Sequence, residues 1–492
     1  MKKSITKNYI YNLIYQITAI IVPLITTPYV SRVLGAEAIG VYSYTLSITT
    51  YFILFGTLGI ALYGQREIAY LQENKKERSK VFWEILILRG ITLTISIIFF
   101  YISFGIYNEY KIYYRILLLE LCTYFIDISW FFQGIEEFKK TVLKNIMIRI
   151  ISLMSVFIFV KSSNDLIKYF FIYVLSNFVG NLSLWAYVSK YIEKVKVREL
   201  NIKKHIRPTF ELFIPQIAVQ LYNVLDRTML GYIINDKSEV GYYEQAQKYI
   251  KVLLTIESSL ITVMIPRVAN SFIKGEKEKL NKYISKSIKF IIFLALPMIF
   301  GTIGIIKQFV PIFYGNGYEK VGNIILIICP ILLFVGLSNV LGAQYLLPTK
   351  QQKKYTISVV IGAVINLLLN TVMIRRFGAY GAALTTCFAE FTVLIIEAYM
   401  IKKEFNLIYE MKKIYKYLLS ALTMFCAIKC IDIFDINIFC NIILKVILGI
   451  VVYLGMLYGI FKDDFVLDVI EKIREKIKEV FLKNEEKNSK NI

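Results

Sequence analysis

The stretch Gly40–Arg66, GVYSYTLSITTYFILFGTLGIALYGQR, has a counterpart later in the chain at Gly241–Arg267, GYYEQAQKYIKVLLTIESSLITVMIPR. Each copy opens on a glycine with a tyrosine two residues on, continues as an apolar segment and ends on an arginine at the same spacing. Just upstream, RVLG from Arg32 matches RTMLG from Arg227. The chain is expected to cross a membrane many times, and the two copies are separated by six predicted membrane-spanning segments, an even number. The sequence therefore predicts two halves of equal orientation, related by an axis along the membrane normal.

The composition requires lipid as the solvent for most of the chain. Of 492 residues, 57% are hydrophobic and only 19% are charged, and the mean hydropathy is +0.56. An average soluble domain carries about 25% charged residues. This balance excludes an ordinary soluble enzyme and predicts a membrane protein.

Apolar stretches long enough to cross a bilayer recur along the chain. They lie at 8–31, 39–63, 83–107, 112–133, 145–160, 166–189, 210–233, 246–268, 286–309, 321–347, 355–374, 379–401, 414–433 and 439–461. The predicted fold is an all-α polytopic membrane protein of about fourteen transmembrane helices. The predicted divisions are an N-terminal six-helix bundle (1–189), a basic cytoplasmic linker (190–208), a C-terminal six-helix bundle (209–402), two appended helices (403–461) and a cytoplasmic amphipathic tail (462–492).

The distribution of basic residues predicts how the chain is oriented in the membrane. Lys and Arg outnumber Asp and Glu by 58 to 36, a net charge of +22. The connections after even-numbered spans are basic, whereas those after odd-numbered spans are short and poor in Lys and Arg, so both termini are expected in the cytoplasm. The basic loops are expected to meet anionic membrane lipids. No nucleic-acid partner is expected, because the basic residues fall in short pieces between apolar runs.

The residues that most enzymes need are scarce. His205 is the only histidine, the six cysteines form no CxxC pair, and there is no GxxxxGK[ST] phosphate loop. We therefore expect no catalytic residues, no metal site and no cofactor, apart from a proton or sodium ion that could couple transport.

Charged residues inside the spans are harder to explain by topology. Gln216, Gln220, Asn223 and Arg227 share one helical face, which either lines a wet cavity or bonds to neighbouring helices. A charge at the bilayer centre costs about 2.5–3.5 kcal/mol on insertion scales, so such groups should not face lipid. Basic residues in both halves favour a large anion, such as a phosphate or pyrophosphate. The candidates for ion coupling are Asp226, Glu257 and Glu390, each of which could equally be a salt-bridge partner.

Several segments together resemble the Wzx-type oligosaccharide flippases, the polysaccharide-transport branch of the multidrug/oligosaccharidyl-lipid/polysaccharide (MOP) exporter superfamily. They are YGQREIA from Tyr63, WFFQGIE from Trp130, Pro215 to Asp226, VGYYEQAQK from Val240, Pro266-Arg267, Asn366 to Asn370 and Gly378 to Ala383. The resemblance implies a V-shaped, MATE-like pair of six-helix bundles in a bacterial plasma membrane, and transport rather than catalysis. It also implies a cargo of undecaprenyl-pyrophosphate-linked oligosaccharide, moved to the outer leaflet for O-antigen or capsule assembly, and a polysaccharide polymerase in the same membrane as a candidate partner.

The resemblance implies that seven basic residues could line a cationic lumen that binds the cargo. These are Arg32, Arg66, Arg149, Arg227, Lys248, Lys251 and Arg267. One departure is the span count, because many such flippases have twelve spans, whereas fourteen resembles the lipid II flippases. A lipid II-type flippase therefore stays an alternative.

Other functions fit the sequence less well. A drug exporter of the same superfamily should have an acidic cavity, and here Arg and Lys dominate. A membrane polymerase or glycosyltransferase needs a sizeable outer loop or an acidic catalytic motif, which the sequence lacks. A scaffolding membrane protein would not need this many charges inside its spans.

Overall fold

The computed structural model describes residues 5–412, 414–434, 437–468, 471 and 474, and every regular element in this part of the chain is helical. The helices are α1 (Ile5–Thr57), α2 (Ile60–Tyr70), α3 (Lys75–Phe100), α4 (Lys111–Ile126), α5 (Ser129–Gly134), α6 (Phe138–Phe159), α7 (Leu166–Val188), α8 (Lys203–Ile233), α9 (Ser238–Ile273), α10 (Lys277–Phe313), α11 (Glu319–Ile328), α12 (Ile331–Asn339), α13 (Gln352–Phe377), α14 (Ala379–Ile401), α15 (Leu407–Met411), α16 (Ile414–Cys430) and α17 (Ile438–Gly455). Short π-helical turns are η1 (Tyr101–Gly105), η4 (Val340–Leu346) and η6 (Met456–Ile460), and 3-10 turns are η2 (Ser163–Asp165), η3 (Val197–Glu199) and η5 (Ile431–Ile433). The predicted all-α class is confirmed. Most of the tail predicted to be amphipathic lies outside the described residues.

The helices are long and apolar enough for a multi-pass membrane protein. Among the described residues, 11 helices meet this condition, or 12 if one bent pair is counted as a span. Two of the predicted spans, 8–31 and 39–63, begin in the single long helix α1, which leaves helical geometry at Gly35 (φ 80°, ψ 170°). The predicted span at 210–233 lies in α8, whose side chains are described only in part.

Two predicted spans are interrupted by residues with special backbone requirements. The helix predicted for 39–63 stops at Leu58 and Gly59, which have φ angles of 44° and 70°. The span predicted for 321–347 is divided into α11 and α12, which bend by 43° where Pro330 follows Cys329. Proline has no N–H to continue the helical hydrogen bonds, so the bend follows from the sequence. Hydropathy averages over both interruptions and does not reveal them.

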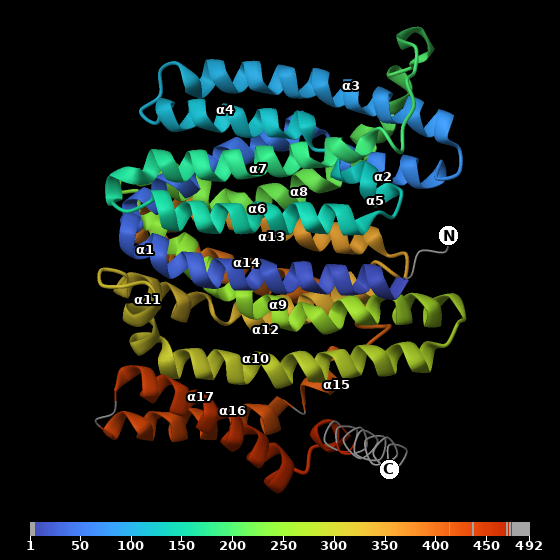
Figure 1. Cartoon of the computed structure of the whole chain (residues 1–492). Coiled ribbons are helices and arrows are strands. Elements are labelled where there is room, and N and C mark those ends of the chain that lie inside the picture. The colour runs from blue at the N-terminus through green and yellow to red at the C-terminus, as the bar shows by residue number, and fades with distance from the viewer. Residues whose placement is uncertain (1–4, 413, 435–436, 469–470, 472–473, 475–492) are drawn as a thin grey trace, which may run out of the picture. The chain divides into compact units, whose positions relative to one another are not determined.

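The chain divides into two compact units. Unit 1 comprises 1–247, 313–324 and 359–386, and unit 2 comprises 248–312, 325–358 and 387–492. Within unit 1, α3 packs on α4, α4 on α7 and α7 on α6, and Figure 1 shows these four helices side by side. Within unit 2, α16 and α17 form a hairpin at the red end of the chain (Figure 1). The bundle boundaries predicted from the sequence stay a prediction.

The glycines that open the two repeat copies, Gly40 and Gly241, lie next to each other in unit 1. A Cβ on Gly40 of α1 would lie 1.7 Å from the carbonyl oxygen of Lys237, and a Cβ on Gly241 of α9 would lie 2.0 Å from the carbonyl oxygen of Ala36. The backbones of α1 and α9 therefore touch, and only glycine fits at either position. Lys237 is itself buried, donates to the carbonyl oxygens of Gly231 (2.7 Å) and Ile234 (3.0 Å) at the end of α8, and has its pKa lowered by that burial.

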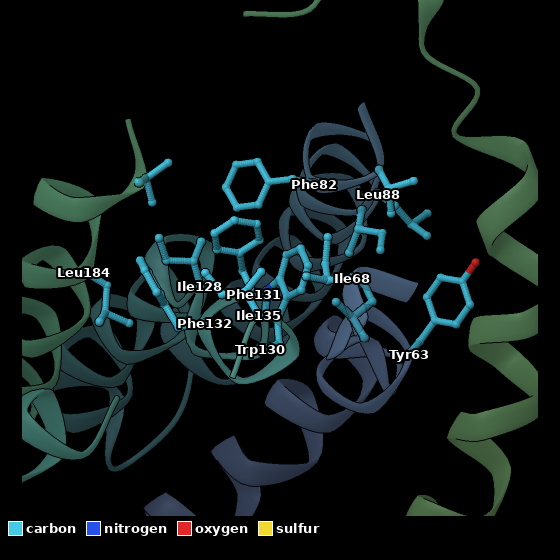
Figure 2. Close-up of a cluster of buried hydrophobic side chains, with 14 residues drawn as sticks. Tyr63, Ile68, Phe82, Leu88, Ile128, Trp130, Phe131, Phe132, Ile135 and Leu184 are labelled. Atoms are coloured by element: carbon cyan, nitrogen blue, oxygen red, sulfur yellow. The ribbon is translucent and has the colours of Figure 1, made fainter. Parts of the chain in front are cut away.

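Two of the segments that resemble the flippase family pack against each other. Trp130 of α5 lies over Gly64 of α2, where an added Cβ would come within 2.5 Å of the indole ring. Trp130 is part of a buried hydrophobic cluster in unit 1, together with Tyr63 and Ile68 of α2. Figure 2 shows Trp130 and Phe131 beside Ile68, with Phe82 next to them. The YGQREIA and WFFQGIE segments thus form a core where α2, α3 and α5 meet.

The predicted basic linker is anchored to α3. Glu84 of α3 is fully buried and accepts hydrogen bonds from the backbone N–H of Asn201 (2.7 Å) and from Lys204 (2.8 Å). Its third contact within the linker is with Nε2 of His205 (2.8 Å), whose Nδ1 lies 2.7 Å from the hydroxyl of Tyr63. His205, in the first turn of α8, therefore has a structural role in joining α8 to α2 and α3.

The two appended helices are fixed to α10 by polar contacts as well as by packing. Lys445 of α17 is 1% exposed, forms an ion pair with Asp432 and donates to Gln308 Oε1 of α10 at 2.8 Å. Tyr453 of α17 donates to the carbonyl oxygen of Phe293 at 3.0 Å. The hairpin is thus an integral part of unit 2.

The α1–α9 contact predicts a large effect of adding one methyl group. Gly40→Ala should lower the free energy of unfolding by about 1–3 kcal/mol, because the new Cβ overlaps a carbonyl oxygen of the neighbouring backbone. The control is Gly455→Ala in α17, where a Cβ meets nothing within 4 Å and the change should be neutral or stabilising. Thermal unfolding of the purified protein in detergent measures both, and equal stability of the two variants would contradict the contact.

Candidate functional site

Asp226 is a buried carboxylate at the centre of a polar cluster in unit 1. It lies on α8 and is 8% exposed. Its Oδ2 accepts from the hydroxyls of Tyr243 (2.5 Å) and Thr386 (2.7 Å), and its Oδ1 accepts from Nδ2 of Asn370 (2.7 Å). These three donors come from α9, α14 and α13 and all are neutral. None of these contacts therefore compensates the charge of an ionised Asp226.

A second layer of polar groups holds the donors in place. Asn370 also donates to Asn366 one turn away (3.0 Å) and accepts from Thr385. Gln247 donates to the Tyr243 hydroxyl at 2.7 Å. Asn366 and Asn370 thus join α13 to α8 through Asp226.

The cluster holds more close oxygen contacts than it has hydroxyl protons. Thr386 Oγ1 lies 2.7 Å from Asp226 Oδ2, 2.7 Å from the carbonyl oxygen of Ala382 and 2.9 Å from the Tyr243 hydroxyl. With the contact between Tyr243 and Asp226 there are thus four oxygen–oxygen contacts, whereas two hydroxyls supply one proton each. If Asp226 is ionised, two contacts lack a proton. A proton on Asp226 would satisfy one of these two contacts, and a small cation could bridge the oxygens of both.

Arg227, the next residue on α8, pairs with a different group. Its Nη1 lies 3.1 Å from Oε2 of Glu244, and both side chains are largely buried. The same Glu244 oxygen accepts from Ser43 of α1 at 3.2 Å. Thr228 extends this junction by contacting Ser47 (2.8 Å) on α1. The second half of α1 is thus bonded to both α8 and α9.

The other predicted lumen residues are distributed over both units. In unit 1, Arg66 is exposed and pairs with Glu67 at 3.0 Å, Arg32 is exposed and packs its Cγ near Gly315, and Arg149 of α6 is half-buried. In unit 2, Lys248 is half-buried, and Lys251 and Arg267 of α9 are exposed. Their common role in binding cargo stays a prediction.

The three predicted coupling acids have different surroundings. Asp226 has the three neutral donors described above. Glu390 of α14 is half-buried. Glu257 of α9 is 1% exposed, and neither of its oxygens has a hydrogen-bond partner among the described residues. No group of three or more His, Cys, Asp or Glu in the described part of the chain could hold a metal ion.

Comparison with known proteins shows which family the chain belongs to. The model of the polysaccharide biosynthesis protein family matches residues 5–272, more than half of the chain, and the MatE model matches 212–372. The chain belongs to the polysaccharide biosynthesis protein family. It is a Wzx-type member of the MOP superfamily, as the sequence resemblance indicates.

Relatives of this chain include proteins named as transporters and as flippases. A putative O-antigen transporter of Escherichia coli K12 is 26% identical over 394 residues, which are 78% of this chain and 93% of the relative. The lipid II flippase MurJ of Bacillus subtilis is 29% identical over 42% of this chain and 40% of its own length. Among solved structures, a lipid II flippase MurJ in an inward closed conformation has a TM-score of 0.76 at 19% identity, covering 92% of this chain and 99% of that chain. The last likeness concerns the fold alone.

Only part of the Asp226 cluster could be identified from the sequence. The sequence identified Asp226 as a charge inside a span, and the segment Asn366 to Asn370 through the family resemblance. It missed Tyr243 and Thr386, since tyrosine and threonine are common in spans. The tyrosine shared by the two repeats at Tyr42 and Tyr243 was the available signal.

The hydrogen bonds to Asp226 predict that two similar mutations on α9 destabilise the protein to different degrees. Tyr243→Phe should destabilise the protein by about 1–3 kcal/mol, because a buried carboxylate loses one of three donors. Tyr249→Phe removes a hydroxyl that meets only the neutral Thr302 at 3.0 Å, and it should cost less. Melting temperatures of the two purified variants test this, and an equal or larger loss for Tyr249→Phe would count against the role of Tyr243.

Proposed function

We propose that this protein flips undecaprenyl-pyrophosphate-linked oligosaccharide repeat units from the cytoplasmic to the outer leaflet for surface polysaccharide assembly. The cargo crosses by alternating access through a cationic central cavity, and a proton or sodium ion is coupled to the movement. The observation that carries the proposal is the match to the putative O-antigen transporter over 93% of that relative's length. The protein acts as a transporter without catalysis.

Basic residues inside the spans support an anionic cargo. Arginine offers paired donors to phosphate oxygens, and a pyrophosphate carries charge that lipid cannot solvate. Arg149 and Arg227 lie in apolar helices of unit 1, and Lys248, Lys251 and Arg267 lie on one helix of unit 2. A cationic path for the pyrophosphate accounts for the retention of these charges within the membrane.

The Asp226 cluster supports coupling to a cation. It has one carboxylate, no cationic donor in its described contacts and fewer protons than close oxygen contacts. Carboxylate, amide and hydroxyl oxygens are the ligands of hard cations, and the carboxylate can equally take a proton. We therefore propose Asp226 as one site of ion coupling.

The charge pattern and the family together suggest the setting. We propose a bacterial plasma membrane with both termini in the cytoplasm, where the basic connections meet anionic lipids. A polysaccharide polymerase in the same membrane would receive the flipped repeat units. Export of lipid II is the second candidate, because a stretch of 222 residues is 29% identical to a lipid II flippase.

A deletion strain tests the cargo. Without the gene, lipid-linked oligosaccharide should accumulate on the cytoplasmic face, where it is protected from externally added glycosidase, and surface polysaccharide should disappear. The wild-type gene should restore export. Accumulation of lipid II in place of the oligosaccharide would reject the repeat-unit cargo in favour of peptidoglycan precursor export.

The same strain tests the cationic path. Arg149→Ala and Arg267→Ala should each abolish surface polysaccharide while the protein remains in the membrane, because the pyrophosphate loses a charged partner. Arg198→Ala is the control, since Arg198 is exposed in the basic connection and should be dispensable for export. Normal export by both lumen variants would remove the cationic-cavity mechanism.

Removing the charge of Asp226 should abolish the response of the protein to its coupling ion. A cation that binds only the folded state raises its stability, so the melting temperature of the wild type should rise with sodium at constant ionic strength, or with acidification if the ion is a proton. Asp226→Asn should lose this response, whereas Asp464→Asn, at an exposed position, should keep it. Identical responses of the wild type and Asp226→Asn to both ions would exclude Asp226 as the coupling site.

A further inference from the structure

Glu257 is a carboxyl group on an otherwise apolar, buried helix face. On α9 it lies in register with Ile250, Ile261 and Met264, which are 1%, 4% and 7% exposed. Glu257 is itself 1% exposed, and none of the described residues donates to either of its oxygens. A carboxyl group in a position that would suit leucine or isoleucine therefore needs an explanation.

The pocket around Glu257 is shaped to hold it. Gly336 of α12 faces the carboxyl, and a Cβ there would lie 2.7 Å from Oε2 of Glu257 and 2.6 Å from Ile291 of α10. Glycine thus leaves the space that the carboxyl occupies. All three residues belong to unit 2.

The two helices shown to face Glu257, α12 and α10, present apolar described residues to it. The sequence of α12, ILLFVGLSN, contains no titratable residue. The face of α10 that carries Ile291 also carries Ile288 and Ala295, and both are fully buried. On α9, the nearest charged residue in sequence is Lys251, six positions away and exposed. The described surroundings of the Glu257 carboxyl are therefore apolar.

A second buried glutamate provides a contrast within the same unit. Glu397 of α14 is also fully buried, but it accepts from Ser338 of α12 (2.8 Å) and Ser358 of α13 (3.0 Å). Two hydroxyl donors can solvate a carboxylate, whereas Glu257 has none among the residues that the structure describes. An ionised carboxylate buried without donors is so unfavourable that the group takes up a proton instead.

The helix that covers Glu257 is interrupted on both sides. It is bent by 43° from α11 at its beginning, and it continues at its end into the π-helical turn η4. Turns of this kind often mark functional positions in helices. A covering helix with two such interruptions can move relative to α9 without unfolding.

We propose that Glu257 is a membrane-embedded proton-binding site, which carries a proton while it packs against Gly336 and exchanges it with water when α12 moves away. In the exchange the carboxyl O–H bond breaks, the proton passes to water and the carboxylate remains. The site is separate from the Asp226 cluster, which lies in the other unit. Its use in transport rests on the proposed function, whereas the protonation of Glu257 does not.

Infrared spectroscopy of the full-length protein in lipid nanodiscs tests the protonation directly. The spectrum of the wild type minus that of Glu257→Gln at neutral pH should contain the carbonyl stretching band of a protonated carboxylic acid, and this band should disappear on strong alkalinisation. Carboxylate stretching bands in the same difference at neutral pH would overturn the proposal. If the glutamine variant does not fold, Glu257→Met serves as the reference, because methionine has a similar volume.

Reconstituted transport separates the proton site from the proposed cargo. In proteoliposomes a pH gradient should accelerate the flipping of a lipid-linked oligosaccharide by the wild type. Glu257→Gln should still flip the cargo, but at the same rate with and without the gradient. Glu397→Gln should retain the acceleration. Full acceleration in Glu257→Gln would overturn the role of Glu257 in transport. Failure of the wild type to flip the cargo would reject the proposed function and leave the infrared result standing.

Discussion

The backbone contact between α1 and α9 at Gly40 and Gly241 is the constraint on which the rest of unit 1 depends. Helices in lipid gain little from burying apolar side chains against each other, so close backbone approach and interhelical hydrogen bonds must hold them. The two glycines permit that approach. Close to them, Ser43 reaches Glu244 and Ser47 reaches Thr228, and these bonds require the short separation that the glycines allow. Because the glycines are equivalent positions of the internal repeat, the contact joins the two copies at matching points.

Buried charges elsewhere in the protein are satisfied to different degrees, and the differences distinguish structural from functional groups. Lys445 has an acidic partner and an amide, and Glu397 has two hydroxyls, as expected for groups that stabilise a fold. Asp226 has donors but no compensating cation in its described contacts, and Glu257 has no donor among the described residues. In a medium of low dielectric constant, an incompletely satisfied carboxylate is costly unless a cation or proton occupies it. The groups that remain incomplete are thus the ones suited to reversible binding.

The sequence predicted the helices well and their interruptions poorly. Spans were predictable because lipid imposes a length and a composition that hydropathy measures directly. The breaks at Leu58 and Gly59 and at Pro330 depend on one or two residues within apolar runs, so the average conceals them. The candidate site was predictable where a charge stood in a span. The neutral partners could not be predicted, because their role arises only when four separate helices come together around Asp226.

The geometry also relates the two kinds of ligand in the proposed transport cycle. Consecutive residues of α8 bind consecutive residues of α9, since Asp226 meets Tyr243 and Arg227 meets Glu244. A pyrophosphate that binds Arg227 shares the guanidinium group with Glu244, and a cation that binds Asp226 alters the contact with the Tyr243 hydroxyl. Both events act on the same short segment of the α8–α9 interface. An ion that alters the first pair therefore changes the geometry of the second, which is the physical requirement for coupling between a cation and an anionic cargo.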